Sequence, residues 1–362
     1  MSHHTKEQAI REYYKYGIKS PEVRMISIVG YDKLNGGKDG IRYAWSDSGV
    51  RPYVESAAFI NKTKNVESNV CGYTTSVSKG CVLRSKGLAC KFCRTGKNLP
   101  FSGFLSDKEI AKQNVFMVLT DIYCEDHPEL KSKKREFAYM GQGEPGFSYQ
   151  QVRSAIEITN RVMRELNQTV YRHIFATCGV PEAIRAYVND LQTFFTERVT
   201  LHFSLHASNH REIIMPINSI FPYQDAVAEL NKVYNISNEK PCIGIMLFNK
   251  FQPAGTSDVY SNTVEEVLSI VKELDPQKCR LSFCEFNSSP ELGQALAFPS
   301  DKASELLATA QKLGFEAKLF SSFGQKEQTA CGMLGGKEPS HSASSKWKEL
   351  DKMANILVEK NS

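Results

Sequence analysis

The amino-acid sequence predicts an α/β protein whose core is a parallel sheet, closed into a partial (β/α)6-type barrel. Six short apolar runs are each separated by a stretch with helical periodicity. The runs cover residues 137–140, 171–176, 199–205, 242–248, 280–286 and 317–321. Because parallel strands need crossover connections, this alternation is typical of a complete or partial barrel. In such barrels the chemistry lies at the C-terminal ends of the strands.

Length and composition agree with this fold class. With 362 residues, the chain is as long as two ordinary domains or one large barrel with attachments. Hydrophobic residues make up 41% and charged residues 23%, which excludes collagen-like, coiled-coil and disordered proteins. Lys and Arg (45) exceed Asp and Glu (40) by only five, so no strong overall charge attracts nucleic acid or an acidic membrane. An RNA substrate would therefore need a local basic patch.

The first residues and the cysteine content predict a cytoplasmic protein. Residues 1–14 carry charges where a signal peptide needs an apolar stretch, and no apolar run is long enough to span a bilayer. In the reducing cytoplasm most of the ten cysteines would be free thiols. Clustered cysteines then indicate metal ligands or catalysts rather than disulfides.

The chain is expected to have three parts. Residues 1–62 combine a polar helix in the first 25 residues with β-hairpins that are rich in turn residues. Residues 63–322 form the barrel, which includes a helix that begins at the capping box from Ser106 to Glu109. Residues 323–362 form a C-terminal segment with the loop around Cys331 and a terminal helix.

Three cysteines, Cys81, Cys90 and Cys93, fall within thirteen residues. A closed structural zinc site needs four ligands, and Cys71 could be the fourth. An iron–sulfur cluster held by only three thiolates would instead leave one iron open for a substrate ligand. The cysteines alone do not decide between these two kinds of site.

A glycine-rich segment from Met140 to Gly146 directly follows a predicted strand. It contains the spacing G-x-G-x-x-G, which is typical of dinucleotide sites. However, Glu144 would place a carboxylate where a pyrophosphate should lie, and Pro145 removes a backbone donor. An acid at a glycine-rich strand end fits an ammonium group better, and a plain turn is the alternative.

Two further features are ambiguous when each is taken alone. Ser204, Leu205 and His206 end another predicted strand, where a serine is commonly a turn residue and a histidine a hydrogen-bonded packing residue. Cys331 lies in a glycine-flanked loop near the C-terminus, which is also what a buried free thiol would look like.

Taken together and in this order, the four features resemble the RlmN/Cfr family of radical S-adenosylmethionine (SAM) RNA methyltransferases. The resemblance runs from about Asp39 to Gly336. It is carried by the three cysteines, MGQGEP at 140–145, SLHASNHREIIMPIN at 204–218, the strand that ends in Glu285-Phe286-Asn287, and FGQKEQTACGML at 323–334. Upstream, the residues around Asp39 and Glu55 look like the hairpin that precedes the barrel in that family.

The resemblance implies a radical SAM barrel with two cofactors, a 4Fe-4S cluster and SAM. The cluster would be held by Cys81, Cys90 and Cys93, and its open iron would chelate the amino and carboxylate groups of SAM. Gly143 and Glu144 would receive the amino group. The rest of SAM would be bound by Ser204, Leu205, His206 and Asn287.

The resemblance also implies a methyl transfer through the protein. Cys331 would take a methyl group from one SAM, and cleavage of a second SAM would give a 5′-deoxyadenosyl radical that abstracts hydrogen from that methyl group. The carbon would then add to an adenine ring carbon, which is too poor a nucleophile for polar methyl transfer. Glu55 would remove the ring proton, and Cys71 is the candidate for the thiol that resolves the adduct as a disulfide with Cys331. The expected partners are ribosomal or transfer RNA and a flavodoxin- or ferredoxin-like electron donor, and the expected state is a monomer without membrane contact.

The chain departs from the family pattern at three places. Eight residues separate Cys81 from Cys90, where the family has three, and Ala176 stands in place of a serine that contacts SAM. The family also has a helical RNA-binding domain before the hairpin, whereas fewer than forty residues precede Asp39. Two alternatives therefore stay open: a radical SAM enzyme for a small metabolite or peptide, and a zinc-stabilised RNA-binding protein without catalysis.

Overall fold

The protein is described from a computed structural model. It describes residues 25–37, 39–51, 53–59, 69–123, 130–131, 133–207, 210–287, 289–320 and 332–362. The helix predicted in the first 25 residues and the proposed catalytic residue Cys331 lie outside these ranges.

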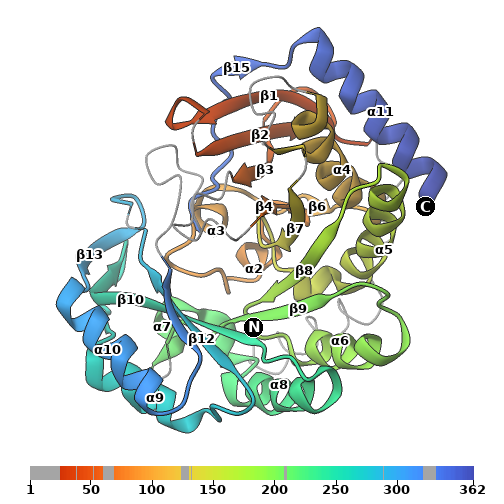
Figure 1. Cartoon of the computed structure of the whole chain (residues 1–362). Coiled ribbons are helices and arrows are strands. Elements are labelled where there is room, and N and C mark those ends of the chain that lie inside the picture. Colours follow the sequence, from red (N-terminus) through yellow and green to blue (C-terminus); the bar gives the residue numbers. More distant parts are fainter. Residues whose placement is uncertain are drawn as a thin grey trace.

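A sheet of parallel strands forms the centre of the molecule (Figure 1). Its parallel strands are β4 (Val70–Thr74), β7 (Lys134–Tyr139), β8 (Val170–Thr177), β9 (Val199–Ser204), β10 (Cys242–Pro253), β12 (Arg280–Glu285) and β14 (Ala317–Phe320), hydrogen-bonded in that order. All six runs predicted from the sequence are strands, so the α/β fold class is confirmed. The strand β4 is an addition to the predicted set. It is a short strand with a glycine at its centre, and it gives little periodic signal.

The connecting helices lie in an arc around the outside of these strands (Figure 1). They are α4 (Asp107–Tyr123), α5 (Tyr149–Glu165), α6 (Pro181–Thr193), α8 (Tyr223–Ser237), α9 (Val264–Glu273) and α10 (Ser300–Lys312). The predicted capping box is confirmed at the start of α4. The Glu109 carboxylate accepts from the Ser106 N–H at 2.8 Å, and the Glu109 N–H donates to the Ser106 hydroxyl at 3.2 Å.

Short elements join the ends of the strands. The short helices are α2 (Val82–Ser85), α3 (Arg94–Asn98), α7 (Arg211–Ile214), η1 (Asn35–Gly37), η3 (Pro145–Ser148) and η4 (Pro216–Ser219). The short strands β5 (Ser78–Lys79) and β6 (Gly103–Phe104) pair with each other, and β11 (Tyr260–Ser261) and β13 (Gly293–Ala297) pair with the second half of β10. Because all the parallel strands end at the same edge, their loops meet there.

The predicted β-rich entry module consists of three antiparallel strands, β1 (Ser27–Leu34), β2 (Gly40–Ser46) and β3 (Val54–Phe59). The strand β3 pairs with β4, so the module and the barrel share one continuous sheet. The C-terminal segment returns to this module, since β15 (His341–Ser342) pairs with β1. The final helix, α11 (Ser345–Asn361), packs on α4 and α5 (Figure 1). The domain boundaries proposed from the sequence stay predictions.

A buried ion pair joins α11 to α4. Lys112 in α4 is fully buried, and its ammonium group lies 3.0 Å from the Asp351 carboxylate in α11. Packed against α5, α11 and the entry strand β3, α4 is buried over most of its length. Among the described helices, none is long and apolar enough to cross a membrane.

Candidate active site

The three clustered cysteines lie in the loop that follows β4, at the C-terminal edge of the sheet. Cys81 directly precedes α2, and Cys93 directly precedes α3. The Cys93 N–H donates to the Cys90 carbonyl at 3.2 Å, which closes the turn between the second and third cysteine. The eight residues between Cys81 and Cys90 contain α2, so the longer spacing forms a local helical turn.

The thiols of this loop lie close enough together to act on one another electrostatically. Burial first, and then the neighbouring Cys93 and Glu144, raise the pKa of Cys81 to about 12. Burial also raises the pKa of Cys90 well above its ordinary value, with added contributions from Cys93 and Cys81. Without a bound cation these thiols stay protonated, whereas a metal centre would stabilise their thiolate form.

The donor set suits an iron–sulfur cluster. In the described ranges, no three His, Cys, Asp or Glu side chains converge as a single metal ion requires. A single zinc ion needs such convergence, whereas a four-iron cube takes each thiolate on a different iron atom. Three soft sulfur donors on one loop are the ligand type and number that such a cube takes when one iron is left for another ligand.

Glu144 joins the segment after β7 to the end of the neighbouring strand β8. It follows β7, and its carboxylate accepts from the Thr177 hydroxyl at 2.6 Å, the Cys178 N–H at 2.9 Å and the Gly146 N–H at 2.8 Å. These three bonds fill most of the carboxylate's lone pairs, so the side chain is held in one orientation. Gly143 has a positive φ of 103°, and a Cβ there would lie 2.1 Å from the Ser78 hydroxyl oxygen, so only glycine fits.

His206 lies directly after β9 in the left-handed conformation, with φ of 58°. Its N–H donates to the Gly244 carbonyl at 2.9 Å, and its ring meets the edge of Phe92, which lies between two of the clustered cysteines. Burial first, and then the nearby Arg211, lower the pKa of His206 to about 3, so the imidazole is neutral. Its buried Nδ1 has no hydrogen-bond partner among the described residues, which is what a site for a polar ligand atom offers.

Arg211 fixes the strand ends beside His206. Its guanidinium donates to the carbonyls of Ser204 (3.0 Å), Leu205 (2.8 Å) and Cys178 (2.8 Å), and to the Asn218 side chain (3.0 Å). Thus one side chain ties the end of β8 to the end of β9. Asn287, the last predicted SAM contact, lies buried just after the end of β12.

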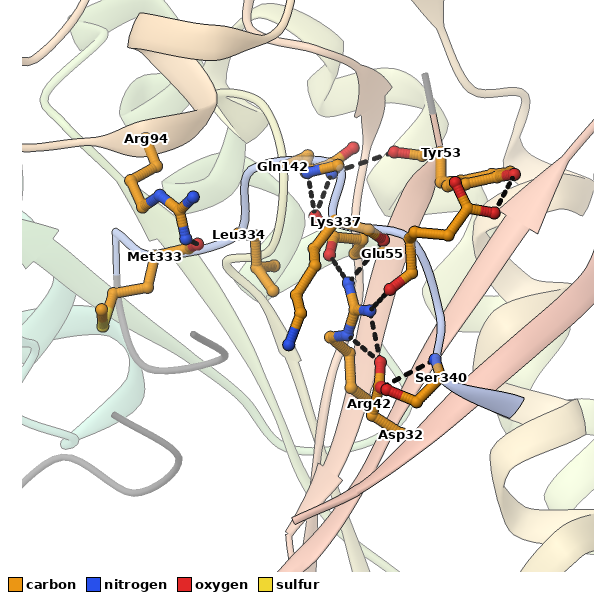
Figure 2. A network of polar contacts seen from close by, with 12 residues as sticks. Asp32, Arg42, Tyr53, Glu55, Arg94, Gln142, Met333, Leu334, Lys337 and Ser340 are labelled. Atoms are coloured by element: carbon orange, nitrogen blue, oxygen red, sulfur yellow. Dashed lines mark hydrogen bonds and ion pairs between the residues drawn. The ribbon is translucent and has the colours of Figure 1, made fainter. Parts of the chain in front are cut away.

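Glu55 is fully buried in a polar network at the side of the site (Figure 2). It forms an ion pair with Arg42, and its second oxygen accepts from the Gln142 side chain at 2.9 Å and the Gly336 N–H at 2.6 Å. Gln142 directly precedes Gly143, so the network reaches the predicted SAM motif. Both oxygens of Glu55 are occupied, and a proton transfer to this carboxylate would require one of these contacts to break.

Arg42 and Asp32 extend the network to the C-terminal segment. Arg42 pairs with Asp32 and donates to the carbonyls of Lys337 (3.1 Å) and Glu338 (3.3 Å), and Asp32 accepts from the Ser340 N–H at 2.9 Å (Figure 2). Burial opposes ionisation of Asp32, but the hydrogen bonds from Ser340 and Arg42 prevail and lower its pKa. Segment 336–340 is thereby anchored on the entry module.

The start of this segment is bound to the cysteine loop. The Arg94 N–H donates to the Gly332 carbonyl at 2.7 Å, and the Thr95 hydroxyl donates to the Leu334 carbonyl at 2.6 Å. The Arg94 side chain also donates to the Met333 carbonyl at 3.4 Å (Figure 2). Cys331 itself lies outside the described residues, but Gly332, the next residue in the chain, contacts the backbone one residue after Cys93.

Cys71 is a predicted site residue that the fold does not bring to this place. It lies at the second position of β4, about 10 Å along the strand from the end that leads into the cysteine loop. Its thiol is buried against the Phe59 carbonyl (3.5 Å) and the Asp121 carboxylate (3.7 Å). Burial first, and then Asp121, raise its pKa far above the ordinary value. The resolving role of Cys71 stays a prediction, and this position does not support it.

Sequence reasoning gave no role to several residues that the fold places here. Cys178 follows β8, and its thiol acts electrostatically on Cys90 and Glu144. Next to it, Thr177 supplies a hydroxyl to Glu144 beside Ala176, which has none. Arg211 and Arg42 organise the two halves of the site. In the sequence, Cys178 and Arg211 are marked only by their positions shortly after predicted strands. Many residues share such positions, so this signal is weak without the fold.

Among known proteins, the chain is similar to RNA methyltransferases named RlmN. No protein-family model matches the chain. The chain is 28% identical over 283 residues to a probable dual-specificity RNA methyltransferase RlmN of Petrotoga mobilis, covering 76% of this chain and 73% of that protein. It is 26% identical over 281 residues to the dual-specificity RNA methyltransferase RlmN of Lawsonia intracellularis, covering 76% of this chain and 69% of that protein. The predicted resemblance to this family is therefore confirmed.

A solved structure shows the same fold. The crystal structure of a radical SAM methyltransferase from Sphaerobacter thermophilus matches with a TM-score of 0.68 at 18% identity, over 92% of this chain and 93% of that one. At this level of identity the match supports the fold class, and it confirms the partial barrel predicted from the sequence.

Proposed function

We propose that this protein is a radical SAM enzyme that methylates an adenine ring carbon in ribosomal or transfer RNA, with Cys331 as the residue that carries the methyl group. The main support is one juxtaposition. The cysteine loop that holds the three proposed cluster ligands is hydrogen-bonded to the segment that begins one residue after Cys331, through the 2.7 Å contact between Arg94 and Gly332. The RNA substrate is inferred from the relatives, which are named RNA methyltransferases.

The side chains have distinct tasks in this proposal. Cys81, Cys90 and Cys93 would hold a 4Fe-4S cluster, which supplies the electron for reductive cleavage of SAM. The backbone at Gly143 and Glu144 would accept hydrogen bonds from the SAM amino group, since the Glu144 carboxylate is already engaged by three donors. His206 Nδ1, neutral and buried, would accept a hydrogen bond from the ligand. Ser204, Leu205 and Asn287 would complete the SAM contacts.

The C-terminal segment would position the methyl carrier. Contacts on both sides of Gly336 attach residues 332–340 to the cysteine loop and to the entry module, so the chain is held on both walls of the site. Glu55 would remove the proton from the adenine ring after one of its present contacts, with Arg42, Gln142 or Gly336, has broken. We also place the protein in the cytoplasm as a monomer, served by a flavodoxin- or ferredoxin-like electron donor.

Intact mass spectrometry of the anaerobically purified protein tests this function. The wild type should be brown, contain iron and carry a methyl adduct on Cys331. The Cys331→Ala variant should still cleave SAM under reducing conditions but transfer no labelled methyl group to RNA. An unchanged product yield in this variant would refute the role of Cys331.

The same preparation distinguishes the two alternatives. A colourless protein that contains zinc would exclude both enzyme proposals. A brown protein that cleaves SAM but labels neither ribosomal nor transfer RNA, freed of protein, would point to a small metabolite or peptide substrate.

A further inference from the structure

Arg211 differs from the other large buried cations of this protein. Among the described residues, three arginines have less than 2% of their surface exposed: Arg42, Arg135 and Arg211. Arg42 pairs with two carboxylates, and Arg135 pairs with Asp121 at 3.0 Å. Within the described residues, no carboxylate lies within ion-pair distance of Arg211. Its hydrogen-bond partners are three backbone carbonyls and the neutral side chain of Asn218.

A buried positive charge with only neutral partners is unfavourable, since hydrogen bonds to carbonyls replace only part of its lost hydration. An arginine stays protonated even when it is buried. The fold nevertheless holds this guanidinium in one orientation with four hydrogen bonds. A negative charge supplied by a bound group would account for such a site.

The surroundings of Arg211 indicate where this charge lies. The helix that Arg211 begins, α7, is attached to the cysteine loop, because the Lys91 N–H donates to the Ile214 carbonyl at 2.8 Å. Arg211 acts electrostatically on the thiols of Cys178 and Cys90, and on Glu144. The guanidinium itself is bonded to the Cys178 carbonyl at the end of β8, and the helix that it begins is bonded to the loop of the proposed cluster ligands.

We propose that Arg211 is the fixed countercharge of the iron–sulfur cluster and favours its reduced state. This inference rests on the proposed function, because it requires the cluster to be bound by the three cysteines. A 4Fe-4S cluster with thiolate ligands is anionic and gains one more negative charge on reduction. A buried cation beside it stabilises the reduced state more than the oxidised one, so Arg211 raises the midpoint potential. Arg211 is thus a positioning residue that also sets the electron affinity of the site.

The test is a redox titration of the reconstituted holoenzyme, monitored by electron paramagnetic resonance without SAM. Arg211→Gln should shift the midpoint potential to more negative values, while Arg211→Lys, which keeps the charge but not the fork of donors, should stay near the wild type. Arg185→Gln is the control, because its side chain is 61% exposed and its charge is screened by water.

A second variant leaves Arg211 in place. Asn218 accepts from Arg211 at 3.0 Å and from the Tyr223 N–H at 3.1 Å. Asn218→Asp keeps both acceptor bonds, has nearly the same shape and gives Arg211 a carboxylate partner. It should shift the potential in the same direction as Arg211→Gln. The exposed substitution Asn189→Asp should have no effect.

Three outcomes are separable. An unchanged potential in both Arg211→Gln and Asn218→Asp, at full iron content, would overturn the inference. An equal shift in Arg211→Lys and Arg211→Gln would also overturn it, because the hydrogen-bond geometry and not the charge would then be responsible. Failure of the wild type to bind iron would instead refute the proposed function.

Discussion

The backbone N–H of Gly336 donates to the Glu55 carboxylate at 2.6 Å and joins two residues that lie 281 positions apart in the chain. This bond connects the C-terminal segment to the entry module at the point where Gln142 also reaches Glu55. The same carboxylate forms the ion pair with Arg42 (Figure 2). The three parts of the chain therefore meet at one buried carboxylate.

The first prediction concerns the stability of this junction. Glu55→Gln leaves Arg42 paired with Asp32. However, its amide cannot accept from Arg42 on one side and from Gln142 and Gly336 on the other, so one donor loses its partner. The free energy of unfolding should fall by about 2 kcal/mol. Urea unfolding followed by circular dichroism measures the change. Glu338→Gln is the control: its pair with Arg51 is 58% exposed on both sides, and its loss should cost about 1 kcal/mol or less. Equal effects of the two substitutions would contradict the buried junction.

The second prediction concerns acid stability. The pKa of Asp32 is lowered below its ordinary value of 3.8 in the folded protein, because the hydrogen bonds from Ser340 and Arg42 outweigh burial. Its contribution to stability is therefore fully present above pH 3.8 and is lost as the pH falls through the lower folded value. The melting temperature of the wild type should fall more steeply than that of Asp32→Asn between about pH 5 and about pH 2. If the melting temperatures of the two proteins fell equally with pH, Asp32 would not stabilise the attachment of segment 336–340.

The fold was largely predictable because its signal is local. Each of the six apolar runs became a strand, since buried parallel strands are continuous hydrophobic runs. The short strand β4 gave no such signal. It is a strand because it pairs with β3 on one side and with β7 on the other. The capping box of α4 was predictable because both of its hydrogen bonds join residues three positions apart.

The site was only partly predictable because its contacts are long-range. The sequence motifs indicated the three cysteines, Glu144 and His206. The salt bridge of Glu55 with Arg42 and the ties of Arg211 to two strand ends depend on which loops meet at the edge of the sheet. Cys71 is the opposite case. It is close to the cysteine loop in sequence, but it lies near the start of β4, away from the end of the strand that leads into that loop.

The third prediction concerns Cys71. Its thiol is enclosed by the Phe59 carbonyl and Asp121, with a pKa raised by burial, so it is poorly suited to attack a disulfide or an adduct. Cys71→Ala should retain methyl transfer to RNA at close to the wild-type rate and reduce stability by about 1 kcal/mol. Denaturing gel electrophoresis of the purified variant checks for covalently attached RNA. Accumulation of such an adduct would restore the resolving role to Cys71.

The last prediction concerns the three proposed cluster ligands. Cys81→Ala, Cys90→Ala and Cys93→Ala should each lose the brown colour and most of the bound iron, because a cluster with three protein thiolates has no spare ligand. Cys242→Ala is the matched control, since this buried thiol lies at the start of β10, at the opposite end of the strand from the site. Its iron content should equal that of the wild type. Iron analysis and visible absorption after anaerobic reconstitution measure the effect. If Cys81→Ala retained its iron while the other two lost it, the ligand would have to be another thiol nearby, and Cys178, which acts on Cys90, would be the residue to substitute next.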